Sequence, residues 1–187
     1  MSESKIERME ANRGMGGKSS TCNVGRVQLR NFCLSDLDDL YEWASDEEVT
    51  KFMTWEYFKS KEKLREFLVK VVIPHPWFKA ICFKGKSNGH VMLKQGTGIH
   101  NCRAEMGYAI ARKYWRMGFT TQAVITTLKM GFKELQGLKR IEALVLPENV
   151  ASARVLEKAG FVKEVFLPKY IYVKGTVRDT LLFSYVV

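Results

Sequence analysis

The stretch NVASARVLEKAGF, residues 149–161, decides the fold class of this 187-residue chain. Asn149 suits an N-cap, and Gly160 is a typical stop for a helix over residues 150–159. Phe161 then begins a pair of strands that we expect over residues 161–173 and 176–187. A capped helix that runs directly into a strand is typical of a domain in which helices cover a sheet.

A glycine loop lies upstream, in YWRMGFTTQA, residues 114–123. We expect a helix after Gly118, because apolar residues follow it at helical spacing, at positions 123, 124, 128, 132 and 135. A helix N-terminus offers unpaired N–H groups and a positive dipole end, which suits phosphate. The loop is neither a P-loop nor a dinucleotide fingerprint. A lone glycine before a helix is also ordinary turn chemistry, and Asn149 and Ser152 could simply cap their helix.

The rest of the chain adds strands and helices to the same sheet. Ser35, Asp46 and Ser60 are the predicted starts of three helical segments. The remaining predicted strands cover residues 26–32, 77–83, 90–94, 103–110 and 140–146, with a hairpin turn at residues 86–89. This order predicts an α/β sandwich around one mixed sheet. We expect a mobile tail over residues 1–24 and one domain over residues 25–187.

Composition limits the class of protein. Hydrophobic residues make up 46% and charged residues 27% of the chain, as in globular proteins. No apolar run reaches the roughly 18 residues of a membrane helix, and the N-terminus lacks the apolar core of a secretory signal. The four cysteines and three histidines show no metal-ligand spacing. We therefore expect no metal, no membrane association, and reduced thiols in the cytoplasm or nucleus.

The net charge of +10 suits an anionic partner, such as nucleic acid, an anionic cofactor or acidic lipid, although it could also serve only solubility. Seven carboxylates between Asp36 and Glu48 meet no lysine or arginine. A uniform nucleic-acid surface would not carry such an acidic block. The block fits an enzyme with a cationic cofactor side and an acidic substrate entrance, or simply a solvated helix face.

Two segments together resemble a known family. AEMGYAIARKYWRMGFTTQAV, residues 104–124, and NVASARVLEKAGF are similar to the two cofactor-binding motifs of the GNAT N-acetyltransferase superfamily. The resemblance is to its ribosomal-protein-alanine acetyltransferase-like branch, and more closely to plant members of that branch. Residues 29–58 also resemble the first third of those plant proteins. The resemblance implies a GNAT-like single domain, with a central mixed, largely antiparallel twisted sheet, helices on both faces and two splayed central strands.

The same resemblance implies acetyl-CoA as the acetyl donor, with its pantetheine arm between the splayed strands that end at Ile110 and Leu146. The backbone of Tyr108, Ala109 and Ile110 would pair with the pantetheine amides. Asn149 and Ser152 would contact the arm near the thioester, and Arg154 would reach the adenosine phosphates. The pyrophosphate would be wrapped by the backbone N–H groups of Trp115, Arg116, Met117, Gly118, Phe119 and Thr120.

Two departures from the family pattern stand out. The family loop usually reads Trp-Gly-Lys-Gly-x-Ala, whereas Arg116, Met117 and Thr120 replace its Gly, Lys and Ala here. Arg116 must therefore accept the backbone angles of a glycine, which could reduce cofactor affinity. Leu156 stands where many relatives place a tyrosine as general acid for the thiolate. Ser152 or an ordered water would have to serve instead.

The implied reaction is the attack of a neutral amine on a thioester carbonyl, which needs backbone N–H groups for the oxyanion and one base. Glu105 is the candidate base, directly or through water, unless it simply pairs with a basic neighbour; Glu142 is a weaker candidate. We expect an acetyl-CoA-dependent N-acetyltransferase for a primary amine, first a protein or peptide α-amine, acting as a monomer or homodimer. The alternatives are a non-catalytic acyl-CoA-binding sensor and a basic nucleic-acid-binding module.

Overall fold

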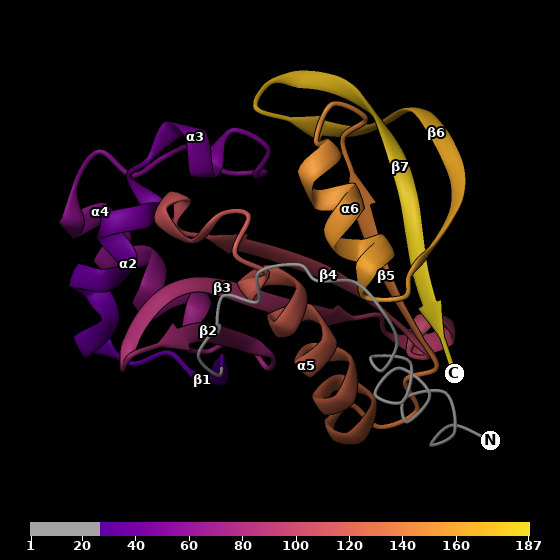
Figure 1. The fold of residues 1–187 in the computed structure, drawn as a ribbon, viewed down its shortest axis with the longest axis horizontal. Coiled ribbons are helices and arrows are strands. Elements are labelled where there is room, and N and C mark those ends of the chain that lie inside the picture. The colour runs from indigo at the N-terminus through magenta and orange to yellow at the C-terminus, as the bar shows by residue number, and fades with distance from the viewer. Residues whose placement is uncertain (1–26) are drawn as a thin grey trace, which may run out of the picture.

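A computed structural model describes residues 27–187, so the tail predicted over residues 1–24 lies outside the described residues. The described chain forms one sheet with helices packed on it (Figure 1). The strands are β1 (Gln28–Asn31), β2 (Phe78–Phe83), β3 (Lys86–Gln95), β4 (Arg103–Ile110), β5 (Arg140–Val145), β6 (Val162–Val173) and β7 (Thr176–Val186). Across the sheet they lie in the order β1-β2-β3-β4-β5-β7-β6.

Within residues 27–187, five α-helices and four 3-10 or π-helical turns connect the strands. The helices are α2 (Leu37–Ala44), α3 (Glu47–Thr50), α4 (Lys61–Phe67), α5 (Phe119–Glu134) and α6 (Val150–Lys158). The turns are η1 (Leu34–Asp36), η2 (Leu68–Val72), η3 (Gly98–His100) and η4 (Arg112–Tyr114). None of the helices within residues 27–187 is both long and apolar enough to cross a membrane.

The two central strands, β4 and β5, separate after a short paired stretch. They are the one parallel pair of the described sheet, and only the rungs Arg103–Arg140, Ala104–Ile141 and Glu105–Glu142 join them. Beyond Glu105, β4 continues to Ile110 and β5 continues to Val145 without further pairing between them. The predicted mixed, largely antiparallel sheet with two splayed central strands is therefore confirmed.

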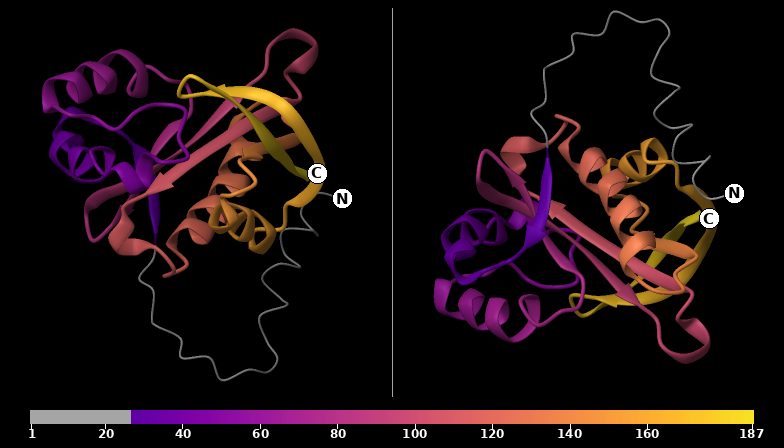
Figure 2. Two further views of the ribbon diagram at one scale, coloured as in Figure 1. Left: turned by 90° about the horizontal axis from the view of Figure 1, so that it is seen from above. Right: turned by 90° about the horizontal axis from the view of Figure 1, so that it is seen from below.

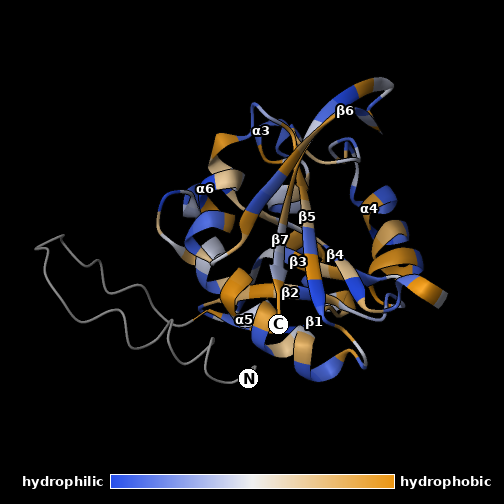
Figure 3. Ribbon diagram, turned by 90° about the vertical axis from the view of Figure 1, so that its right-hand side faces the viewer, coloured by the Kyte–Doolittle hydropathy of each residue, from blue (hydrophilic) through white to orange (hydrophobic). Residues whose placement is uncertain are grey.

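Helices cover both faces of this sheet, as predicted (Figure 2). On one face α5 and α6 pack against Met106 and Ile110 of β4. On the opposite face α2, α4 and η2 pack against Ala80 of β2 and Ala109 of β4. The two cores follow from the alternation of side chains along each strand. On β5 buried positions alternate with partly exposed ones, and its polar residues are among the partly exposed ones (Figure 3).

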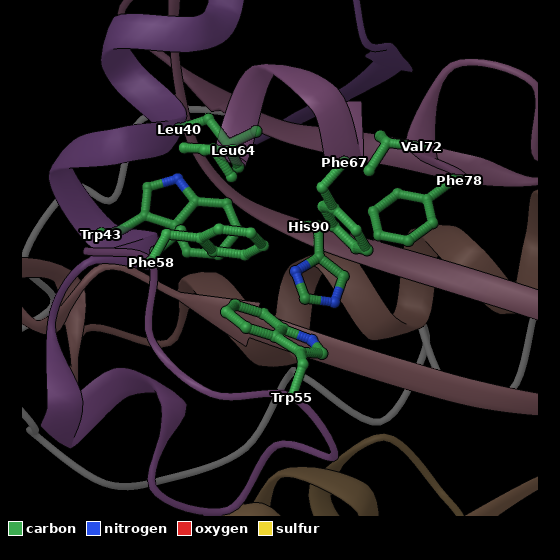
Figure 4. A pocket seen from close by; sticks show the side chains of 10 residues that line it. Leu40, Trp43, Trp55, Phe58, Leu64, Phe67, Val72, Phe78 and His90 are labelled. Carbon is green, nitrogen blue, oxygen red and sulfur yellow. The ribbon is translucent and has the colours of Figure 1, made fainter. Parts of the chain in front are cut away.

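A buried histidine joins the second core to the sheet. The His90 ring, on β3, stacks between Trp43 and Phe78 at centroid distances of 5.6 and 4.9 Å. It lies in a small apolar pocket beneath α2 and α4 (Figure 4), and burial lowers its pKa to about 3. His90 is therefore a neutral member of the core. The pocket is lined by Leu40, Trp43, Ala44, Trp55, Phe58, Leu64, Phe67, Val72, Phe78 and His90.

The predicted hairpin turn at residues 86–89 is wrong. Lys84 and Gly85, with φ of 52° and 78°, make the turn, and β3 already begins at Lys86. Two left-handed residues are what a two-residue hairpin turn requires. Gly89 instead lies inside β3, where an added Cβ would stand 2.3 Å from the Ala109 carbonyl oxygen. The glycine thus serves the close approach of β3 and β4.

The predicted helix cap at Ser35 is also wrong. The chain first forms η1, and the Asp36 carboxylate accepts the Cys33 backbone N–H at 2.9 Å. The same carboxylate forms two hydrogen bonds with the Arg30 guanidinium, at 2.5 and 2.7 Å, which help to hold the pKa of Asp36 below its usual value. The caps predicted at Asp46 and Ser60 are confirmed, because each side chain accepts a backbone N–H of its helix.

Candidate active site

The gap between β4 and β5 leaves backbone groups of β4 without a strand partner. The Ala111 N–H donates to the Asn88 carbonyl of β3 at 2.7 Å. Because backbone groups alternate between the two edges of a strand, those of Tyr108 and Ile110 face the gap, and those of Ala109 face β3. The Ile110 carbonyl already accepts the indole N–H of Trp115 at 3.0 Å. An extended ligand with amide groups could pair with the remaining groups at this edge.

The loop between β4 and α5 offers a row of free N–H groups. Within residues 27–187, the backbone N–H groups of residues 116–121 meet no acceptor, and the first that does is that of Gln122, bound to the Gly118 carbonyl at 3.1 Å. Arg116 and Gly118 have φ of 62° and 81°. The expectation that Arg116 must adopt glycine-like angles is confirmed. The free N–H groups and the dipole of α5 together fit a pyrophosphate.

Aromatic packing fixes this loop to the core. Phe119, the first residue of α5, is 2% exposed and packs against Phe83 and Tyr114 at centroid distances of 4.7 and 5.4 Å. The side chains of Trp115 and Met117 remain exposed, although the Trp115 indole N–H reaches the Ile110 carbonyl. The helix start is therefore anchored by a buried side chain while its N–H groups stay open to a ligand.

Ion pairs remove much of the cationic charge expected near the loop. Arg112 lies 3.1 Å from Asp46, and Lys113 lies 2.5 Å from Glu42. Asp38 is likewise paired with Lys61. Arg116 forms no ion pair with another described residue, so it is the cation of this loop left for a phosphate. The acidic block is largely neutralised by the same pairs and by those of Asp36 and Asp39.

The start of α6 reaches across to β4. The Asn149 side-chain oxygen accepts the Ser152 N–H at 3.2 Å, so Asn149 is the N-cap, as predicted. The Ser152 hydroxyl lies 2.7 Å from the Tyr108 hydroxyl. Burial raises the pKa of Tyr108 well above its usual value. From the sequence we expected only backbone contacts for Tyr108. Because side chains alternate along a strand, the Tyr108 side chain lies on the same face of β4 as Met106 and Ile110, toward α6. This alternation is the signal that could have suggested the contact.

The two glutamates predicted as base candidates lie on the other face of the sheet. Glu105 is exposed and makes no ion pair with another residue of the described chain. Glu142 is bound to Arg103 at 2.8 Å and to Arg140 at 2.6 Å. The pairing with a basic neighbour that we considered for Glu105 therefore occurs at Glu142 instead. Glu105 is therefore the freer carboxylate of the two.

The structure does not bring Glu105 and Ser152 together. Glu105 lies on the last paired rung of β4, about 10 Å along the strand from Tyr108 and on the opposite face. Leu156 is 0% exposed in the core and carries no polar atom, so it cannot serve as a general acid. Arg154 is exposed on the outer side of α6. In the described residues no three His, Cys, Asp or Glu side chains gather as metal ligands.

The chain matches the family described as acetyltransferase (GNAT) domain over residues 26–162. The uncharacterized N-acetyltransferase p20 of Bacillus licheniformis is 33% identical over 176 residues, 88% of this chain and 94% of that protein. The ribosomal protein uS5-alanine N-acetyltransferase of Escherichia coli is 30% identical over 84 residues, 45% of this chain and 42% of that protein. A GNAT-family acetyltransferase structure from Bacillus anthracis has a TM-score of 0.76 and 29% identity, covering 86% of this chain and 95% of that chain.

Proposed function

We propose that the acceptor of this protein is the α-amine of a protein or peptide. The protein belongs to the GNAT acetyltransferase family and is an acetyl-CoA-dependent N-acetyltransferase. The single observation that carries this proposal is the gap between β4 and β5, which pair only as far as the rung Glu105–Glu142 and leave the exposed Glu105 at its start. The partial identity with the uS5-alanine N-acetyltransferase supports a protein substrate.

The proposed cofactor residues follow the features of the gap. Tyr108 and Ile110 bind the pantetheine amides through backbone groups. The prediction that the Ala109 backbone also pairs with them does not hold, because its N–H and carbonyl groups face β3. Asn149 and Ser152 contact the arm near the thioester, and Arg154 the adenosine phosphates. The pyrophosphate binds the loop residues Arg116, Met117, Gly118, Phe119 and Thr120. The prediction for the Trp115 backbone does not hold, because its N–H already donates to the Arg112 carbonyl at 3.0 Å. The free N–H groups of residues 116–121 support this assignment.

The acceptor approaches from the face that carries Glu105. The turn between β6 and β7 closes one side of this face, because the Lys174 ammonium donates to the Thr50 carbonyl at 3.0 Å and lies 3.5 Å from Glu56. The N-terminus of a peptide can enter beside this bridge, because no part of the substrate extends beyond its α-amine. Glu105, exposed and unpaired within the described residues, takes the amine proton through water.

Residues 25–187 act as one catalytic domain in this proposal, which the two cores within residues 27–187 support. The free thiols of Cys33, Cys82 and Cys102 support a cytoplasmic site of action, whereas the bacterial relatives lend no support to a nuclear one. The relatives named above are all bacterial, so the plant-like branch stays a prediction. Whether the protein acts as a monomer or a homodimer also stays open to measurement.

A non-catalytic acyl-CoA-binding sensor is the second candidate. The left-handed backbone of Arg116, at a position where the family usually has glycine, favours it. Tight binding of CoA without turnover on any amine would support the sensor and contradict the enzyme.

An acceptor pair tests the proposal directly. Thiol release from acetyl-CoA is measured with a peptide that has a free N-terminus and no lysine, and with the same peptide N-formylated and given one lysine. We expect turnover with the first peptide only. Turnover only with the second, or only with a polyamine such as spermidine, would overturn the α-amine as acceptor.

A further inference from the structure

One side-chain hydrogen bond crosses from β4 to α6 at the cofactor gap. The Tyr108 hydroxyl lies 2.7 Å from Ser152 Oγ and 3.2 Å from the Ser152 carbonyl oxygen. Tyr108 comes from the strand that loses its partner at the gap, and Ser152 from the first turn of α6. The hydroxyl groups of Tyr108 and Ser152 are therefore hydrogen-bonded to each other at the place where the thioester is expected to lie.

We propose that Tyr108 is a positioning residue for Ser152, and that its phenol donates to Ser152 Oγ so that the serine O–H is left to donate to the sulfur of CoA. This inference rests on the proposed function. The Ser152 hydroxyl then supplies the hydrogen bond to sulfur that many relatives would obtain from a tyrosine at the position of Leu156. Leu156 itself is buried in the core and has no polar group to offer.

The direction of the Tyr108–Ser152 bond follows from acidity and from what the carbonyl already does. A phenol is a better hydrogen-bond donor than an aliphatic hydroxyl, and it makes the shorter contact with Oγ. The Ser152 carbonyl lies inside α6, where it accepts the N–H of the residue four positions ahead. The phenol proton is therefore best placed on Ser152 Oγ, and the serine proton is free to point elsewhere.

The environment keeps this donor neutral and fixed. Burial raises the pKa of Tyr108, so it stays protonated throughout the working pH range. The Ser152 N–H is held by the Asn149 side chain at 3.2 Å, which orients the first turn of α6. Ser152 is thus held at its backbone by one residue and at its hydroxyl by the other.

The chemical step balances without a proton from either hydroxyl. The amine nitrogen forms a bond to the thioester carbonyl carbon, the C–S bond breaks, and its electron pair goes to sulfur. The amine loses one proton to water, assisted by Glu105, and the thiolate takes one proton from water. Ser152 donates only a hydrogen bond to the developing thiolate, because an aliphatic hydroxyl is far less acidic than a thiol.

Binding of CoA and desulfo-CoA to the full chain, measured by calorimetry from neutral to alkaline pH, tests the pair without turnover. In the unaltered protein, the ratio of the affinity for CoA to the affinity for desulfo-CoA should rise as the pH increases and the CoA thiol ionises. One hydrogen bond to a charged group corresponds to a rise of roughly 10-fold. Tyr108→Phe and Ser152→Ala should both abolish this rise, so that the ratio of the two affinities stays constant across the pH range. Tyr170→Phe, which removes an exposed hydroxyl on β6, is the matched control.

Kinetics supply the second readout. Tyr108→Phe should lower kcat roughly 10-fold with little change in KM for acetyl-CoA, and the double variant should be no slower than Ser152→Ala. A Tyr108→Phe protein that keeps the pH-dependent rise, or losses that add in the double variant, would overturn the pairing while the proposed function stands. If Tyr108→Phe fails to fold, Tyr108→Met, which also removes the phenol hydroxyl, carries the same binding test. Failure of the unaltered protein to bind CoA would overturn the proposed function itself.

Discussion

Arg112 Nε lies 3.1 Å from the Asp46 carboxylate and so joins the loop that precedes α5 to the first turn of α3. Asp46 is also the N-cap of α3, because its side chain accepts the Glu48 N–H at 3.0 Å. One carboxylate therefore serves the cofactor loop and the helix on the acceptor side. Asp46 is thus one of the carboxylates of the acidic block, interpreted above as an acidic substrate entrance, that are engaged within the protein.

Substitutions at Asp46 separate the cap from the ion pair. Asp46→Asn keeps a capping side chain but removes the charge, so it should change the free energy of unfolding by less than about 1 kcal/mol. Asp46→Ala also removes the cap and should cost about 1 kcal/mol more. Urea unfolding of both variants measures the difference. Equal losses in the two variants would mean that the cap contributes nothing.

Arg116 carries a backbone strain that a glycine would relieve. Arg116→Gly and Arg116→Ala both remove the charge, but only glycine adopts a φ of 62° without a Cβ penalty. The glycine variant should therefore be more stable than the alanine variant by about 1 kcal/mol. Both should bind acetyl-CoA more weakly at low salt if Arg116 contacts phosphate. Alanine and glycine variants of equal stability would contradict the strain.

Two strand glycines give a matched pair for packing. An added Cβ at Gly89 would lie 2.3 Å from the Ala109 carbonyl oxygen, whereas at Gly107 the nearest atom would be a Met92 side-chain carbon at 3.5 Å. Gly89→Ala must push β3 away from β4 and should destabilise the fold by more than about 2 kcal/mol. Gly107→Ala should fold almost normally. Thermal unfolding of the two proteins distinguishes them, and similar melting temperatures would contradict the close approach at Gly89.

His90 should make the protein sensitive to acid. Its pKa is about 3 in the folded state and about 6.5 in the unfolded chain, so the unfolded state binds one more proton between these values. Stability from this group is present above pH 6.5 and falls by about 1.4 kcal/mol per pH unit as the pH drops below it. His75, whose pKa is also lowered by burial, adds to the same trend.

His90→Phe tests this contribution, because the ring stacking is kept and the titration is removed. Urea unfolding at pH 5 and pH 7 should show a smaller acid loss in the variant than in the unaltered protein. His100→Gln, on an exposed turn, is the control and should keep the full pH dependence. An identical acid loss in His90→Phe would mean that His90 is not buried as a neutral ring.

Local sequence signals predicted most elements, and they failed where distant contacts decide the structure. The alternation around Met106 and Tyr108 predicted β4 with its observed ends, and Asn149 and Gly160 bounded α6. The Asn88-Gly89 pair resembled a hairpin turn, but Gly89 lies inside β3, where the close packing against β4 requires a residue without a Cβ. The splay of β4 and β5 followed only from the family resemblance, because no local pattern encodes missing rungs.

The candidate site was predicted in part for the same reason. The glycine-like angles of Arg116 could be expected from the family motif, since φ depends on local geometry. The ion pairs of Arg112 and Lys113 could not, because their partners lie more than 60 positions earlier in the chain. The Tyr108–Ser152 contact likewise joins residues 44 positions apart, and only the folded sheet brings them together.

A crystal structure of the full chain with acetyl-CoA tests the central claim most directly. The account predicts the pantetheine arm between β4 and β5, with its amides on the backbone of Tyr108 and Ile110. It also predicts the pyrophosphate on the N–H groups of residues 116–121 and the thioester beside Ser152. Acetyl-CoA bound elsewhere, with the gap between β4 and β5 left free, would contradict it.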